Sequence, residues 1–160
     1  MRKLQLMPEL KDILTNKKME SINQLRKLYR LKHIERMNTV LNRKESSAEH
    51  SWSCMILADY FLNLMEGRKK KGKSMIIDRL KVYELLMYHD VIEIEAGDVP
   101  IHHVKERENK KEKEQKAFAI IKEDFPEALK EKFAKLFQEF EEQKTVEARF
   151  ARAIDRKSVV

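Results

Sequence analysis

Hydrophobic residues recur along this chain at spacings of three and four, which is the spacing of one face of an α-helix. The stretch over residues 20–33, for example, carries apolar side chains at Ile22, Leu25, Leu28 and Leu31. Alternation of apolar and polar residues, which would predict strands, is hard to find anywhere. The pattern therefore predicts an all-α fold.

Capping residues mark where the expected helices begin and end. Ser46 and Glu49 have the spacing of a capping box, which predicts a helix from this point to about Gly67. Asp78 is a suitable N-cap for the next helix, which Gly97 ends. The full set of about six to seven expected helices covers residues 3–15, 20–33, 46–67, 78–96, 103–122, 126–143 and the stretch from Thr145 onward.

Length and composition agree with this pattern. The chain has 160 residues, of which 38% are charged, 8% are aromatic and three are glycine, as is typical of one helical domain. We expect a single domain over residues 1–160, with 1–19 as a peripheral N-terminal segment and 34–46 as an irregular connection. Residues 1–19 lack a signal-peptide core, and no apolar run reaches membrane-spanning length. A soluble, cytoplasmic protein without a membrane partner is therefore expected.

The net charge of +7 admits an anionic partner, such as a nucleotide or a nucleic acid. The one pure basic run, within residues 68–73, has no interleaved aromatic residue, so we interpret it as a solvated loop and consider a nucleic-acid partner unlikely. The single Cys54 excludes an internal disulfide and a Cys-rich zinc site, and its surroundings favour an ordinary buried thiol. Trp52 and the methionines are expected to pack in the core.

Three titratable side chains interrupt the most apolar of the expected helices. His89 and Asp90 are adjacent, and Glu93 follows them at helical spacing. Buried titratable groups need partners, and two isolated polar residues on other apolar faces, His50 and Asp155, would supply them. A lone inward histidine is more often a satisfied core residue than a ligand. The residues alone therefore leave a metal site and a buried polar network both open.

A divalent transition ion such as Mn²⁺, Co²⁺ or Fe²⁺ accepts this mixture of imidazole and carboxylate ligands, whereas Mg²⁺ and Zn²⁺ are less suited. Such an ion acidifies water and polarises a phosphoryl oxygen. Glu93 is surplus to the ligands and is placed to move a proton. The metal-site hypothesis is therefore a metal-dependent hydrolase whose four protein ligands are His50, His89, Asp90 and Asp155.

Three blocks of sequence carry a resemblance to a known family. They are Ala48-Glu49-His50-Ser51-Trp52, the stretch from His89-Asp90 to Gly97-Asp98-Val99-Pro100, and the stretch from Glu147 to Arg156. In this order they resemble the HD-domain metal-dependent phosphohydrolases, specifically the 5′-deoxynucleotidase branch, over roughly residues 20–156. The resemblance implies an all-α HD-domain helical bundle, commonly a homodimer, that removes the 5′-phosphate from (deoxy)nucleoside monophosphates.

The resemblance also implies a role for individual residues. Glu93 matches the family's catalytic acid/base residue. Asp98 matches a residue at the substrate sugar or the attacking water, and Arg36 matches an arginine that contacts phosphate, a group that a guanidinium binds with two parallel hydrogen bonds. The family's metal ligands are matched by His50, His89, Asp90 and Asp155.

Two other functions remain open from the sequence. Hydrolases of guanosine alarmones share this fold, although they carry a Glu-Asp pair where this chain has Glu93-Ile94. A non-catalytic nucleic-acid-binding module is the second alternative, against which the complete set of ligands argues. The sequence given ends five residues after Asp155. We therefore expect this end either to be buried against a partner subunit or to be the least stable part of the site.

Overall fold

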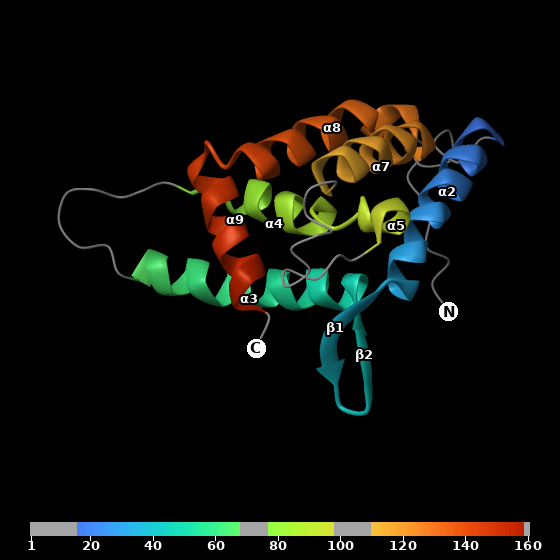
Figure 1. The fold of residues 1–160 in the computed structure, drawn as a ribbon. Helices are drawn as coiled ribbons and strands as arrows, with labels where there is room; N and C mark the ends of the chain where they lie inside the picture. The colour runs from blue at the N-terminus through green and yellow to red at the C-terminus, as the bar shows by residue number, and fades with distance from the viewer. Residues whose placement is uncertain (1–15, 68–76, 98–109, 159–160) are drawn as a thin grey trace, which may run out of the picture.

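The computed structural model of the protein describes residues 16–67, 77–97 and 110–158, which form a helical bundle with one β-hairpin (Figure 1). The predicted all-α bundle is confirmed. None of the helices in these three stretches is long and apolar enough to cross a membrane. The elements in chain order are α2 (Asn16–Leu28), the 3-10 helix η1 (Tyr29–His33), β1 (Glu35–Val40), β2 (Arg43–Ser46), α3 (Ser47–Gly67), α4 (Arg79–Tyr88), α5 (Glu93–Ala96), α7 (Lys110–Asp124), α8 (Glu127–Glu142) and α9 (Val146–Lys157).

The helix α4 is the centre of the main hydrophobic core, into which its Val82, Leu85 and Leu86 are buried. It lies between α3 on one side and α8 on the other, and α9 crosses from the end of α8 to α3 (Figure 1). This packing brings the first turns of α3, the end of α4 and the end of α9 together. The buried residues of this core are Cys54, Ala58, Leu62, Val82, Leu85, Leu86, Leu136, Phe140, Ala148, Ala151 and Ile154.

A second core cluster holds α7 and α8 against the segment that follows α4. Phe125 and Phe133, both fully buried, stack with ring centroids 4.3 Å apart and planes within 9° of parallel. Val91 and Ile92 belong to the same cluster. These two residues directly follow His89 and Asp90 in the chain, so aromatic packing on this side fixes the position of the polar pair.

The helix caps expected from the sequence are present. At the start of α3, the Ser46 backbone N–H donates to Glu49 at 2.9 Å, and the Glu49 N–H donates to the Ser46 hydroxyl at 3.3 Å. This reciprocal pair is the predicted capping box. Asp78 and Thr145 each accept a hydrogen bond from the backbone three residues on, at 3.1 and 3.2 Å. Both therefore cap the helices that they precede.

The expectation of an irregular connection over residues 34–46 is wrong. β1 and β2 form an antiparallel hairpin, in which Glu35 pairs with Ser46 and Thr39 pairs with Lys44. Between these pairs, the three residues 36–38 lie opposite a single residue of β2, so the hairpin contains a bulge. The strands are rich in charged residues and mostly exposed, so the sequence has no alternation of apolar and polar residues that would predict them.

The helix expected over residues 78–96 is interrupted after Tyr88, where α4 ends, and resumes as α5 at Glu93. His89 Nδ1 lies 2.8 Å from the backbone oxygen of Leu86, one turn earlier in the helix. In a continuous α-helix the Leu86 carbonyl oxygen would accept from the backbone N–H of Asp90. Here the His89 ring nitrogen takes that place, and the chain then continues in tighter turns.

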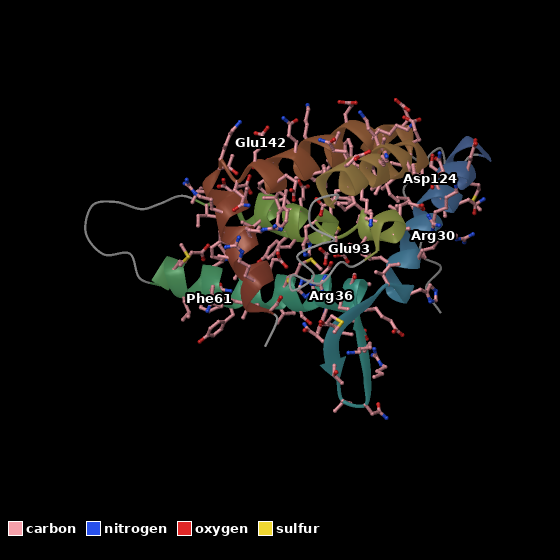
Figure 2. The ribbon with its side chains drawn as sticks, viewed as in Figure 1. Arg30, Arg36, Phe61, Glu93, Asp124 and Glu142 are labelled. Carbon is pink, nitrogen blue, oxygen red and sulfur yellow. The ribbon has the colours of Figure 1, made fainter. Side chains whose placement is uncertain are left out.

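The expectation that Trp52 packs in the core is wrong. Trp52 and Phe61 are 62% and 40% exposed, and Figure 2 shows Phe61 on the outer side of the helix. The inward face is instead covered by residues four apart, ending in the buried Leu62. Met37 and Met87 are also exposed rather than packed in the core. The segment 3–15, the basic run at 68–73, the start of the helix expected over 103–122, and Asp98 lie outside the described residues.

Candidate metal centre

The predicted polar residues meet where the start of α3, the end of α4 and the end of α9 converge. His50 comes from the first turn of α3, His89 and Asp90 directly follow α4, and Asp155 belongs to α9. His50 Nε2 lies 3.1 Å from Asp155 Oδ1, and His89 Nε2 lies 3.2 Å from Asp90 Oδ1. Both histidine side chains are at most 1% exposed. Residues more than 100 positions apart thus form one buried cluster.

His89 presents an unsatisfied ring nitrogen to this cluster. Its Nδ1 lies 2.8 Å from the Leu86 carbonyl oxygen, so in the neutral imidazole the Nδ1–H donates there and Nε2 keeps its lone pair. Nε2 is buried and makes no hydrogen bond within the described part of the chain. A buried ring nitrogen that makes no hydrogen bond is unfavourable unless something else occupies the space in front of it. A cation would satisfy it.

Both ring nitrogens of His50 have a polar partner, and the two partners together fix the orientation of the ring. Its Nε2 faces Asp155, and its Nδ1 lies 3.3 Å from the hydroxyl of Ser158, which follows α9. The Ser158 hydroxyl also donates to the Asp155 backbone oxygen at 2.8 Å. Hydrogen bonds at the far nitrogen of a metal-binding histidine fix its tautomer and the rotation of its ring. The sequence did not single out Ser158, because a serine at a helix end is common.

Asp90 is held beside the histidines by Arg36. Arg36 Nη1 donates to Asp90 Oδ2 at 2.8 Å and to Glu93 Oε1 at 3.4 Å, and its side chain is 13% exposed. Figure 2 shows Arg36 and Glu93 close together at the centre of the molecule, between the hairpin and α5. Arg36 lies in the bulge of β1, where the extra residues allow a side chain to be re-aimed toward the helices.

Glu93 has a second partner that sequence reasoning missed. The Ser47 hydroxyl, fully buried in the first turn of α3, donates to Glu93 Oε2 at 2.5 Å. Each carboxylate oxygen of Glu93 therefore has a hydrogen-bond donor, Ser47 on one and Arg36 on the other. Ser47 lies next to the capping box, so the sequence suggests only a role at the start of the helix and not a contact with Glu93. Only the fold shows that its hydroxyl reaches the α4–α5 junction.

Cys54 also belongs to the cluster. His50, Cys54, His89 and Asp155 each offer a metal-binding atom, and these four atoms all lie within 4.8 Å of one another. Burial raises the pKa of the Cys54 thiol to about 12, as expected for the ordinary buried thiol that the sequence predicts. Asp90 is not a member of this most compact group, although Asp90 Oδ2 lies 3.8 Å from His50 Nε2.

The cluster favours a positive charge at its centre. Burial alone would lower the pKa of His89, but the carboxylates of Asp90 and Asp155 outweigh it and raise the pKa to about 9. Burial would likewise raise the pKa of Asp155, yet His50 and His89 hold that pKa well below its usual range. The same negative potential that stabilises an imidazolium would attract a divalent cation, which binds neutral histidines. The donor set therefore fits a metal ion.

The fold and this cluster are those of an HD-domain protein. The sequence profile of the HD domain matches residues 28–160, which is most of the chain. The chain belongs to the HD-domain family. It is also 26% identical to the human 5′-deoxynucleotidase HDDC2 over 135 residues, and 27% identical to the same-named protein of Xenopus laevis over 138 residues.

These alignments cover 82% and 86% of this chain but 61% and 62% of the two relatives. The chain thus spans about three fifths of the length of the curated relatives it matches. A crystal structure described as a predicted metal-dependent phosphohydrolase, from Magnetospirillum magnetotacticum MS-1, shares 31% identity with it. The two superpose with a TM-score of 0.72, over 86% of this chain and 66% of the other.

Proposed function

We propose that this protein is a metal-dependent phosphohydrolase that removes the 5′-phosphate from nucleoside monophosphates, including deoxynucleotides. The observation that carries the proposal is the meeting of His50, His89 and Asp155 beside a carboxylate, Glu93, which has its own donors. The names of the curated relatives support the reaction and the substrate class. The resemblance of the motifs from Glu49-His50 to Asp155 supports it further.

His50, His89, Asp90 and Asp155 would hold the ion in this proposal. A divalent transition ion such as Mn²⁺, Co²⁺ or Fe²⁺, once bound, supplies Lewis acidity toward the phosphoryl oxygen and toward water. The protein's own contribution is to bring these donors together where α3, the end of α4 and α9 meet, with both histidine side chains buried. The His89 Nδ1–H donates to the Leu86 carbonyl oxygen, and His50 Nδ1 lies against the Ser158 hydroxyl, so the far side of each ring is held in place.

Glu93 would transfer the proton during attack by water and departure of the nucleoside. Its carboxylate is held at Oε2 by Ser47 and at Oε1 by Arg36, so it is oriented before substrate arrives. Arg36 is the proposed phosphate-binding residue and is already bonded to Asp90 and Glu93. The guanidinium of Arg36 would also donate to a phosphate oxygen of the substrate. Asp98, at the substrate sugar or the attacking water, completes the proposed set.

The decisive experiment is a panel of nucleotides offered to the purified protein with Mn²⁺, Co²⁺ or Mg²⁺. We expect inorganic phosphate from deoxynucleoside and ribonucleoside 5′-monophosphates with the transition ions, loss of activity with a chelator, and its return when the ion is restored. Release of pyrophosphate from a guanosine alarmone, with no phosphate from any monophosphate, would replace the proposed substrate class. No turnover of any nucleotide with any of the three ions would contradict the proposal.

We also propose that the protein forms a homodimer through the outer face of α3. Trp52, Ile56 and Tyr60 recur at steps of four on this face and are 56–62% exposed. Contiguous exposed apolar side chains are typical of protein interfaces. Light scattering should give a dimer at micromolar concentration, and Ile56→Glu should give a monomer. A monomeric wild-type protein at that concentration would contradict the dimer without touching the proposed activity.

A further inference from the structure

We propose that Cys54 is an additional ligand of the metal ion, so that the centre combines imidazole, carboxylate and thiolate donors. The consequence is a preference for ions with affinity for sulfur, such as Zn²⁺ and Co²⁺, over Mn²⁺ and Mg²⁺. This inference rests on the proposed function in one respect, which is that the cluster binds a metal ion.

The first observation is the position of the sulfur. Cys54 follows His50 by four residues, so both side chains lie on the inward face of α3. Both residues are 0% exposed, and Cys54 Sγ lies 3.5 Å from His50 Nε2. The thiol is therefore neither at the surface nor surrounded only by hydrocarbon. It lies beside the nitrogen that the metal-binding prediction requires.

The second observation is the size of the group that includes Cys54. Its sulfur, one nitrogen of each histidine and one Asp155 oxygen all lie within 4.8 Å of one another. Bonds of transition ions to such donors are about 2.0–2.3 Å long, so donors on one ion lie at most about 4.6 Å apart. The observed upper limit is close to this value, so the four donors need only small movements to share an ion.

The third observation is independent of the cysteine. His89 Nε2 belongs to the same group of donors, is buried, and makes no hydrogen bond among the described residues. The His89 side chain is 1% exposed, and its ring centroid lies 5.5 Å from that of His50. A buried ring nitrogen without a hydrogen bond, in the same group of donors as the sulfur, points to a ligand between them.

Asp90 explains why sulfur would be needed. Its Oδ2 accepts from Arg36 at 2.8 Å and it lies outside the compact group that includes Cys54. A carboxylate that is shared with a guanidinium is a weaker donor to a metal than a free one. Sulfur from Cys54 would complete the coordination from the opposite helix, with Asp90 still able to bind through its Oδ1, which faces His89.

Coordination by Cys54 releases one proton. In the structure the thiol donates a hydrogen bond to the Ser158 hydroxyl at 3.1 Å. On binding, the S–H bond breaks, the sulfur electron pair goes to the ion, and the proton leaves to solvent. The Ser158 hydroxyl, which donates to the Asp155 backbone oxygen, stays in place beside the sulfur. No oxidant or reductant takes part.

The test is the absorption spectrum of the full chain titrated with Co²⁺, which gives a sulfur-to-cobalt charge-transfer band in the near ultraviolet only when sulfur coordinates. Cys54 is the single cysteine, so no other thiolate contributes such a band. We expect the band in the wild-type protein and its loss in both Cys54→Ser and Cys54→Ala. Both variants should keep the visible ligand-field bands, because the imidazole and carboxylate donors remain.

The affinities for Zn²⁺ and Mn²⁺ provide a second readout that does not depend on catalysis. The ratio of the Zn²⁺ to the Mn²⁺ binding constant should fall roughly tenfold or more in Cys54→Ser. Bound Co²⁺ without a charge-transfer band in the wild-type protein would overturn the cysteine ligand alone. Failure of the wild-type protein to bind Co²⁺ in equilibrium dialysis would overturn the metal centre of the proposed function, and this inference with it.

Discussion

The Ser47 hydroxyl donates a 2.5 Å hydrogen bond to Glu93 Oε2, joining the first turn of α3 to the junction between α4 and α5. The residues are 46 positions apart in the chain, and Ser47 is fully buried. Because the opposite oxygen of Glu93 accepts from Arg36, the carboxylate cannot rotate without losing both partners. Its orientation is therefore set by the fold.

Replacing Ser47 by alanine should reduce kcat about tenfold with little change in KM, because a hydrogen bond to a charged group contributes about 1.5 kcal/mol or more. Steady-state kinetics with a nucleoside monophosphate measures this. Ser51→Ala is the matched control, since Ser51 is also buried on α3 but its hydroxyl donates to the Ser47 backbone oxygen at 3.0 Å. Equal losses in the two variants would show that Ser47 acts only through helix stability.

The carboxylate itself is expected to matter more. Glu93→Gln should keep metal and nucleotide binding yet lose about 10²-fold or more in kcat, the usual scale for removing a proton-transfer group. Metal content and nucleotide affinity are measured on the same preparation. Glu95→Gln serves as the control, because Glu95 lies in the same short helix and pairs with Arg30 at 2.6 Å, away from the histidines. Full turnover in Glu93→Gln would remove this residue from the chemistry.

Asp90 should be required for metal binding. Asp90→Ala is expected to lose both the bound transition ion and activity, with helix content retained, because α4 is packed by Val82, Leu85 and Leu86. Elemental analysis and circular dichroism report the two properties. Asp124→Ala, which breaks a surface pair with Lys27, should keep the ion. A wild-type metal content in Asp90→Ala would exclude Asp90 as a ligand.

Thermal stability should fall in acid through the capping box of α3. Hydrogen bonds from the Arg43 guanidinium and from the Ser46 amide and hydroxyl lower the pKa of Glu49 from 4.5 to about 2. A folded-state pKa below the unfolded value means that the contribution is present above about pH 4.5 and is lost as pH falls toward 2. The melting temperature of Glu49→Gln should therefore vary less with pH over this range than that of the wild-type protein. The same change of melting temperature with pH in both proteins would refute the stabilising role of the Glu49 carboxylate.

Much of the helical fold follows from local sequence signals. The capping box at Ser46, the caps at Asp78 and Thr145, and the apolar spacing of α8 and α9 all give helices at the expected places. The hairpin was not predictable in the same way, since its stability comes from backbone pairing and from side-chain contacts with α3. The burial of Trp52 was predicted wrongly because residue type cannot say which of two faces a neighbour covers.

The candidate site likewise contains residues that the sequence indicates and residues that only the fold shows. His50, His89, Asp90 and Asp155 stand out because titratable residues on apolar faces are conspicuous, and the fold brings them together. Ser47, Cys54 and Ser158 do not stand out, since small residues of these types are common in helices. Their contributions depend on which side chains lie across the bundle, which only the packing of α3 against α4 and α9 determines.

The direction in which the Arg36 side chain points depends on the number of residues in the bulge of β1. β2 leads directly into α3, so the strand pairing ties Arg36 to the helix that bears His50. Successive side chains of a strand point to opposite faces, and a shift of one residue would turn Arg36 away from Asp90 and Glu93. Neither histidine lies in the hairpin, because His50 belongs to α3 and His89 directly follows α4. An insertion or deletion in this hairpin would thus remove the donor that Asp90 Oδ2 and Glu93 Oε1 share, so the length of a surface strand sets the partner of two carboxylates in the centre of the molecule.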